Sequence, residues 1–290
     1  MKRCIFILAA CLPVLSALAS DLPAYRIFDK KGKPVTFDRM VAGTGDKQVV
    51  LFGEFHDDPI VHWLQLQLTR RLYADRKGKL VLGAEMFEAD MQQPLTAYVQ
   101  GLTDEKTFKS EVTSLWSNYE TDYRPLVEFA KAHSLPFIAT NIPRYLARYV
   151  YRNGFGALDT IPETAKRLLP PLPLPYQSDL PGYRAMLEMG GGHAGENMPK
   201  SQASKDATMA YHIVQALTGP YADRTLIHYN GSYHSDGFEG IVWYLRQYNP
   251  LLTTATIATV RQKDVNRLEK AYIGKADFIV CVDEDMTKTH

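Results

Sequence analysis

Two short turns, far apart in the chain, carry the residues best suited to chemistry. Gly53-Glu54-Phe55-His56 and Gly231-Ser232-Tyr233-His234 each end an apolar run typical of a β-strand, and each precedes a helix-like segment. In open α/β sheets, ligands bind in the crevice beyond the carboxyl ends of the strands. We therefore expect His56 and His234 to meet at one site.

Carboxylates follow a second apolar run at residues 80–82, so they are expected at the end of a neighbouring strand. Imidazoles and carboxylates together at strand ends can hold a divalent metal, or they can act as general acid and base. They can also be ordinary loop and helix-capping residues. The predicted metal ligands are His56, Glu85 and His234, and the predicted general bases of a metal-dependent hydrolase are Glu54 and Glu88.

A segment rich in Pro and Gly at residues 161–201 has the composition of an inserted lid rather than of a core sheet. Haem iron is bound axially by His, Met, Cys or Tyr within a flat apolar surround. The alternative is an amphipathic lid helix whose side chains only pack. The residues of this segment that could contact a haem are Tyr176, Tyr183, Met189 and His193.

Composition and missing motifs exclude several classes of protein. The net charge of +1 offers no electrostatic footprint for nucleic acid. The chain has no G-x-S-x-G elbow, Walker loop, strand-linked G-x-G-x-x-G or H-E-x-x-H, which disfavours serine hydrolases, nucleotide-binding proteins and common zinc proteases. Cys281 lies in a strand-like run and is expected to be a buried core residue.

The first 19 residues have the pattern of an export signal. Lys2 and Arg3 precede an apolar stretch, and Ala17-Leu18-Ala19 is a small-residue cleavage site. Leu8-Ala9-Ala10-Cys11 also matches a lipobox, in which case the signal would end before a lipidated Cys11. We expect an exported protein, either periplasmic or attached to the outer membrane as a lipoprotein.

Residues 20–290 are expected to form one domain. Apolar runs at 49–52, 80–82, 136–140, 226–229, 254–260 and 278–282 alternate with helix-like segments. This alternation predicts an α/β fold, with a mainly parallel central sheet and helices on both faces. Residues 24–37 are expected to add a β-hairpin at the edge of the sheet.

Four motifs in this order resemble the ChaN-type haem-binding proteins, within the wider Tiki/TraB and erythromycin-esterase-like superfamily. They are Gly53-Glu54-Phe55-His56-Asp57, Gly83-Ala84-Glu85-Met86-Phe87-Glu88, the stretch from Glu196 to Ala210, and Gly231-Ser232-Tyr233-His234. The resemblance spans residues 49–260. It implies an α/β fold, haem bound through tyrosine, and a homodimer around paired haems. It also implies that His56, Glu85 and His234 occupy the superfamily's metal-binding or catalytic positions.

ChaN-type proteins are exported and linked to iron uptake, so the resemblance implies haem acquisition or storage, with an outer-membrane receptor as a partner. Tyr183 and Tyr176 are the expected iron ligands, and His193 a second contact. The alternative is a hydrolase that uses the strand-end residues with a divalent metal.

Overall fold

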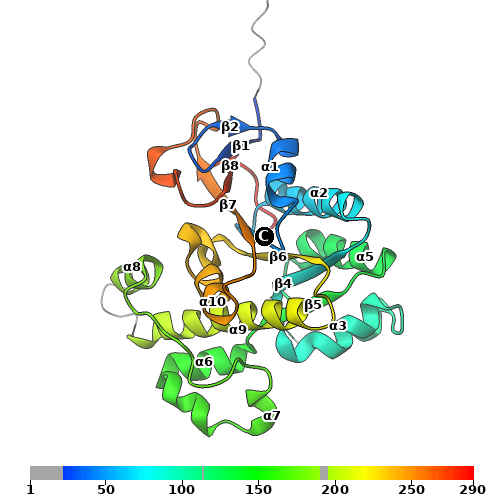
Figure 1. The fold of residues 1–290 in the computed structure, drawn as a ribbon, viewed down its shortest axis with the longest axis vertical. Helices are drawn as coiled ribbons and strands as arrows, with labels where there is room; N and C mark the ends of the chain where they lie inside the picture. The colour runs from blue at the N-terminus through cyan, green and yellow to red at the C-terminus, as the bar shows by residue number, and fades with distance from the viewer. Residues whose placement is uncertain (1–21, 113, 190–194) are drawn as a thin grey trace, which may run out of the picture.

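The computed structural model describes residues 22–112, 114–189 and 195–290. Its centre is one eight-stranded sheet (Figure 1). The strands are β1 Tyr25–Asp29, β2 Pro34–Val35, β3 Val49–Glu54, β4 Leu80–Glu88, β5 Phe137–Asn141, β6 Thr225–Gly231, β7 Thr254–Gln262 and β8 Phe278–Asp283. Their order is β2-β1-β8-β7-β3-β6-β4-β5. The strands β8, β7, β3, β6, β4 and β5 run parallel to one another, and β1 pairs antiparallel with β2 and β8.

Helices cover both faces of this sheet, as the alternation of strands and helices predicts. They are α1 Phe37–Thr44, α2 Pro59–Asp75, α3 Gln92–Val99, α4 Glu105–Glu111, α5 Arg124–Ala132, α6 Arg144–Asn153, α7 Glu163–Lys166, α8 Pro181–Met189, α9 Asn197–Thr218 and α10 Ile241–Tyr248. Helices α6 and α9 pack together, and Figure 1 shows α7 and α8 beside them at one end of the molecule. The predicted α/β fold and edge hairpin are confirmed.

Strand β3 shows how the sheet organises two cores. Val50 and Phe52 pack with α2 and α5 on one face, while Val49 and Leu51 pack with α9 and α10 on the other. All four side chains are fully buried. Burial of one such side chain is worth about 1.5–3 kcal/mol. The continuous apolar run therefore holds β3 at the centre, with its last residues at the site.

The segment after His56 is held by the start of α2. The Asp58 carboxylate accepts hydrogen bonds from the backbone N–H groups of Ile60 and Val61, at 3.1 and 3.2 Å. Pro59 occupies the first helical turn, where its missing N–H costs no hydrogen bond. Asp58 therefore caps α2, and the turn between β3 and α2 is short.

Strand β4 is longer than the apolar run at residues 80–82 predicts. It continues to Glu88, so Glu85 and Glu88 lie within the strand rather than in a turn after it. Pairing with β5 and β6 on both sides extends the strand, with a register shift relative to β5 between Ala84 and Glu88. The glycine at position 83 permits the close pairing with β6, because a Cβ at this position would lie only 3.2 Å from the His228 ring.

Most of the segment predicted as a lid packs against the second core. Ala165, Leu169, Leu174 and Tyr183 are buried there beside residues of α9. His193 lies outside the described residues, as do the leader and Cys11.

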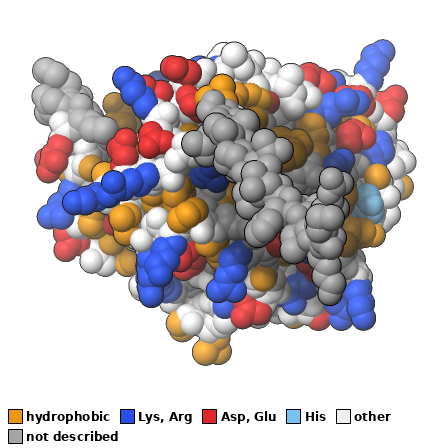
Figure 2. Space-filling view, turned by 90° about the horizontal axis from the view of Figure 1, so that it is seen from above, with side chains coloured by type: hydrophobic (Ala, Val, Ile, Leu, Met, Phe, Trp, Pro, Cys, Tyr) orange, Lys and Arg blue, Asp and Glu red, His pale blue; other side chains and the backbone are white. Residues whose placement is uncertain are grey.

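The described surface mixes charge and apolar groups. On the face seen in Figure 2, basic and acidic side chains alternate with apolar ones and do not gather by sign. None of the described helices combines the length and apolar character needed to cross a membrane.

Candidate functional site

The two G-x-x-H turns lie side by side at the carboxyl ends of β3 and β6. These strands are parallel neighbours, and Glu54 is in register with Gly231. A side chain at Gly231 could not fit, because a Cβ would lie 2.9 Å from two atoms of the His56 ring. The expectation that the two turns meet is therefore confirmed, and the glycine is what lets the imidazole approach β6.

His234 lies buried between two carboxylates. Its Nδ1 is 2.5 Å from Asp206 Oδ1, and its Nε2 is 3.1 Å from Glu85 Oε1. Burial alone would lower the pKa of His234, but the charges of Glu85 and Asp206 outweigh it and raise the pKa to about 9. Burial likewise opposes ionisation of Glu85, yet His234 holds the Glu85 pKa well below its usual range. The group is a carboxylate–imidazolium–carboxylate cluster at neutral pH.

Asp206 links this cluster to α9 and was not singled out by its chemistry in the sequence. Its second carboxylate oxygen accepts a 2.8 Å hydrogen bond from the Tyr183 hydroxyl. Asp206 is 1% exposed on a helix face that also buries Ala203, Ala207 and Ala210. A charged residue among small apolar residues at helical spacing was the available signal, since a buried carboxylate requires partners.

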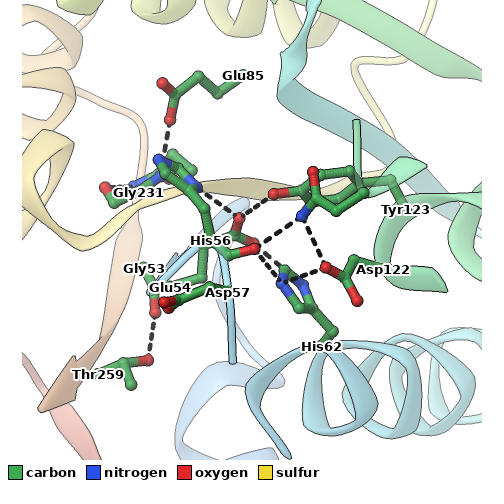
Figure 3. Close-up of polar contacts among 12 residues, drawn as sticks. Gly53, Glu54, His56, Asp57, His62, Glu85, Asp122, Tyr123, Gly231 and Thr259 are labelled. Carbon is green, nitrogen blue, oxygen red and sulfur yellow. Dashed lines mark hydrogen bonds and ion pairs between the residues drawn. The ribbon is translucent and has the colours of Figure 1, made fainter. Parts of the chain in front are cut away.

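His56 is paired with Glu54 in a second cluster (Figure 3). Its Nδ1 is 2.9 Å from Glu54 Oε1, which also accepts the Tyr123 hydroxyl at 2.7 Å. Gln65 donates to the other Glu54 oxygen at 2.6 Å. Burial would raise the pKa of Glu54, but His62 and His56 outweigh it and lower the pKa. Glu54 is therefore a fixed, ionised partner that orients the His56 ring.

The outer side of the His56 ring faces a cavity of about 530 Å³. Its side chain is 39% exposed, against 5% for His234. Asn118 and His62 both hydrogen-bond the His56 carbonyl oxygen, and Trp116 contacts the ring edge-on with centroids 4.7 Å apart. Burial lowers the pKa of His56, but the bond to Glu54 and the charge of Glu85 raise it overall. His56 is the accessible acid or base of the site.

Residues near the C-terminus lie at the mouth of this cavity. Lys288 pairs with Asp57 at 2.9 Å, and the Thr289 hydroxyl donates to Asp122 at 2.7 Å. His290 lines the cavity together with His56. Access to His56 is therefore narrowed from this side.

The arrangement supports acid–base chemistry. Each imidazole is oriented by a carboxylate, as in hydrolases where such a pair moves a proton. Ser232 is not positioned as a nucleophile, because its Oγ accepts a 3.1 Å bond from the Thr259 backbone N–H. Water activated by His56 is the nucleophile that this geometry favours.

The predicted divalent-metal site is not supported. Across residues 22–112, 114–189 and 195–290, no three His, Cys, Asp or Glu side chains are placed to hold one ion. His234 has both ring nitrogens engaged with carboxylates, those of Asp206 and Glu85. Glu85 is similarly committed, because its Oε2 accepts the Gly231 backbone N–H at 2.7 Å (Figure 3). The contacts that Asp206 and Gly231 make with His234 and Glu85 account for this difference.

Two further cavities continue from the strand-end cavity. One of about 360 Å³ shares Glu85 and Lys205 with it and lies between α6 and α9. The next, of about 520 Å³, shares Glu88, Arg144 and Arg148 with the second and follows the outer side of α6. The three cavities therefore adjoin one another in a row from the buried histidines to the surface of α6, and we refer to this row as the furrow.

Helix α6 presents a basic and aromatic face to the furrow. Leu146, Ala147 and Val150 are buried against the second core. On the opposite face, Tyr145, Tyr149 and Tyr151 are 55%, 38% and 48% exposed, and arginines alternate with them. The exposed set consists of Arg144, Tyr145, Arg148, Tyr149, Tyr151 and Arg152. The sequence analysis did not identify this face; the spacing of four between Arg144, Arg148 and Arg152 and between Tyr145 and Tyr149 was the signal.

Glu88 stands at the start of α6 and not beside the buried histidines. One of its oxygens accepts the Arg144 backbone N–H at 2.8 Å, and the other accepts the Ser114 hydroxyl at 3.2 Å. The Arg144 guanidinium pairs with the same carboxylate at 3.4 Å. Glu88 thus caps a helix, whereas Glu54 and Glu85 belong to the histidine clusters.

Of the two tyrosines of the predicted lid, Tyr183 is buried and Tyr176 is half-buried. Tyr183 is 3% exposed, and burial together with Asp206 raises the pKa of its hydroxyl far above the usual range. Tyr176 stacks on Tyr183 with ring centroids 5.8 Å apart, and burial raises its pKa as well. Met189 ends α8, and its side chain is outside the described part, as is His193.

Solved structures with this fold include a ChaN protein and an esterase. The cofacial-haem complex of ChaN from Campylobacter jejuni aligns with a TM-score of 0.66 at 16% identity, over 88% of this chain and 96% of that one. A Bacillus cereus protein aligns with a TM-score of 0.51 at 12% identity, over 89% of this chain and 95% of that one. A mutant of the erythromycin esterase EreC in its open conformation aligns with a TM-score of 0.50 at 10% identity, over 89% of this chain and 97% of that one. No curated protein matches the sequence.

At these identities the structural likeness establishes the fold alone. A family model provides the more specific assignment. It is described as "Haem-binding uptake, Tiki superfamily, ChaN" and matches residues 40–245, from α1 to α10. That range includes both G-x-x-H turns, the buried carboxylates and the exposed face of α6. The chain belongs to the ChaN family of haem-binding proteins.

Proposed function

We propose that the protein binds haem on the exposed face of α6. Membership of the haem-binding family supports the ligand, and one observation supports the place: the exposed Tyr145 and Tyr149 alternate with arginines over a cavity of about 520 Å³, and the exposed Tyr151 lines the adjoining cavity. Haem needs an axial ligand, a flat apolar surround and cationic partners for its propionates. Tyr145, Tyr149, Arg148 and Arg152 line that cavity and meet these needs.

Tyr151 is the favoured axial ligand. Its side chain is 48% exposed, it lines the cavity between α6 and α9, and its hydroxyl has no hydrogen-bond partner within the described chain. Burial, Asp90 and Glu88 raise the pKa of Tyr145, which opposes the phenolate form that ferric iron requires. Tyr183 would have to give up its bond to Asp206 before it could serve.

The cellular role that we propose is haem acquisition or storage outside the cytoplasm. The leader-like first 19 residues support export, and the Cys11 lipobox supports attachment to the outer membrane as the alternative to a periplasmic protein. A homodimer and an outer-membrane receptor are the proposed partners. Mass determination of the protein purified from bacterial membranes distinguishes cleavage after Ala19 from a lipidated Cys11.

A haem titration followed by absorbance tests the binding proposal. Wild-type protein should bind haem saturably and give a tyrosinate-type ferric spectrum. Tyr151→Phe should lose that spectrum and bind at least about 10-fold more weakly, because the axial bond is removed. Tyr183→Phe is the matched control and should retain the wild-type spectrum.

The outcomes separate the two placements of the ligand. Loss of the tyrosinate spectrum in Tyr183→Phe, with Tyr151→Phe unchanged, would return the iron to the predicted lid. Absence of saturable binding by the wild-type protein would reject haem binding altogether.

A second function, hydrolysis, is favoured by the pairing of His56 with Glu54 beside the His234 cluster. His56 is the proposed general base, and the reaction needs no metal held by these side chains. In the His56→Gln variant, turnover of a panel of carboxylic esters should fall by at least about 100-fold. His133→Gln, on the exposed end of α5, should leave turnover unchanged. Equal turnover by the His56→Gln variant and the wild-type protein would reject the proposal that His56 catalyses hydrolysis.

A further inference from the structure

The cavity between α6 and α9 contains more positive than negative charge. Its two carboxylates already have partners: Glu88 pairs with Arg144, and Glu85 pairs with His234. Arg148 and Lys205 also line the cavity. Within the described residues, neither forms an ion pair. Two cations therefore face the same space outside any ion pair, and the nearest carboxylate to influence Lys205, that of Glu85, is already paired with His234.

A buried acceptor in the same cavity also lacks a partner. Asn141 is 8% exposed at the end of β5, and its Nδ2 donates to the Glu85 carbonyl oxygen at 3.0 Å. Its Oδ1 is buried and accepts no hydrogen bond from the described chain. Buried polar atoms without partners are uncommon and often mark a missing water or ligand. The cavity is thus polar and cationic, and one of its buried hydrogen-bond acceptors lacks a donor.

The position of the cavity limits what can enter it. Its volume is about 360 Å³, and it shares Arg144 and Arg148 with the larger cavity along α6. A ligand that covers the face of α6 would insert an arm here rather than its whole body. Arg148 lines both cavities, so it stands where such an arm would leave the face.

We propose that Arg148 and Lys205 bind a carboxylate arm of a porphyrin in this cavity. The inference rests on the proposed haem binding and adds the group that orients the ligand. Propionates are the anionic groups of haem, and a guanidinium recognises a planar carboxylate through two parallel hydrogen bonds. Lys205 supplies a second, point-like charge from α9. The arm enters between the two helices, beside Tyr151.

Absorbance titrations of the full chain with haem and with haem dimethyl ester test this. Arg148→Met and Lys205→Met should each weaken haem binding by about 10- to 100-fold, since a charged hydrogen bond is lost. Both variants should keep the tyrosinate spectrum. The dimethyl ester should bind all three proteins with equal, weak affinity. Lys200→Met, also on α9 but outside the cavity, should match the wild type.

The outcomes distinguish this inference from the function beneath it. Equal binding of haem and its dimethyl ester by the wild-type protein would overturn the carboxylate site and leave haem binding intact. Wild-type affinity in Lys205→Met, together with a loss in Arg152→Met as large as in Arg148→Met, would move the carboxylate to the outer cavity and also overturn the inference. Saturable binding of succinate alone, measured by calorimetry, would show a general carboxylate site instead. No haem binding by the wild type would reject both proposals.

Discussion

Raising the pH from 6.5 to 9 is expected to lower the free energy of unfolding by about 3 kcal/mol through His234 alone. The folded pKa of about 9 lies above the unfolded value of 6.5. Below pH 6.5 both states hold the proton, so the stabilisation is fully present. Between the two values only the folded state holds it, and each pH unit removes about 1.4 kcal/mol. Urea unfolding at several pH values measures this decrease.

His234→Gln isolates the contribution, because it removes the titrating group and leaves the other histidines in place. The difference in unfolding free energy between wild type and variant should shrink as the pH rises through this window. His133→Gln should retain the full wild-type decrease. A constant difference between wild type and His234→Gln from pH 6.5 to 9 would show that His234 is not an imidazolium in the folded protein.

Asp206→Ala is expected to destabilise the protein by about 3–5 kcal/mol. The change leaves a buried His234 cation with one carboxylate partner fewer and deprives the Tyr183 hydroxyl of its acceptor. Removing one partner of a buried ion pair has this cost because the other charge stays out of water. Denaturant unfolding near pH 7 measures the change.

The control is Asp75→Ala, which removes a solvent-exposed partner of Arg71 on α2. That pair should contribute under about 1 kcal/mol. The double variant Asp206→Ala with His234→Gln removes both charges and should cost less than the sum of the two single changes. Strict additivity, or a loss below about 1 kcal/mol in Asp206→Ala, would contradict a tightly coupled buried pair.

The furrow places two kinds of chemistry within one molecule. The buried histidine clusters stand at the strand ends, while the tyrosines and arginines stand on a helix surface reached through the cavity beside Lys205. Variants of the strand-end residues should therefore change stability and acid–base behaviour, and variants of the α6 face should change ligand affinity. This separation allows the haem and hydrolase proposals to be tested independently.

The sequence by itself determined the central architecture of this protein. Apolar runs such as Val49 to Phe52 are typical of strands that are buried on both faces, and their alternation with helix-like segments predicts the parallel sheet. Asp58 and Pro59 mark the start of α2 through local hydrogen bonding and a restricted φ angle. The paired G-x-x-H turns also predict that His56 and His234 meet, since parallel strands end at one edge.

Only the tertiary structure decided what those residues contact. The metal prediction treated His234 as a free ligand, but Asp206 and Glu85 occupy both of its nitrogens from separate elements, 28 and 149 residues away. Such partners depend on how α9 and β4 pack, and no local pattern encodes that distance. Likewise, Tyr183 and Tyr151 are the same residue type on short helices, and only packing makes one buried and the other exposed.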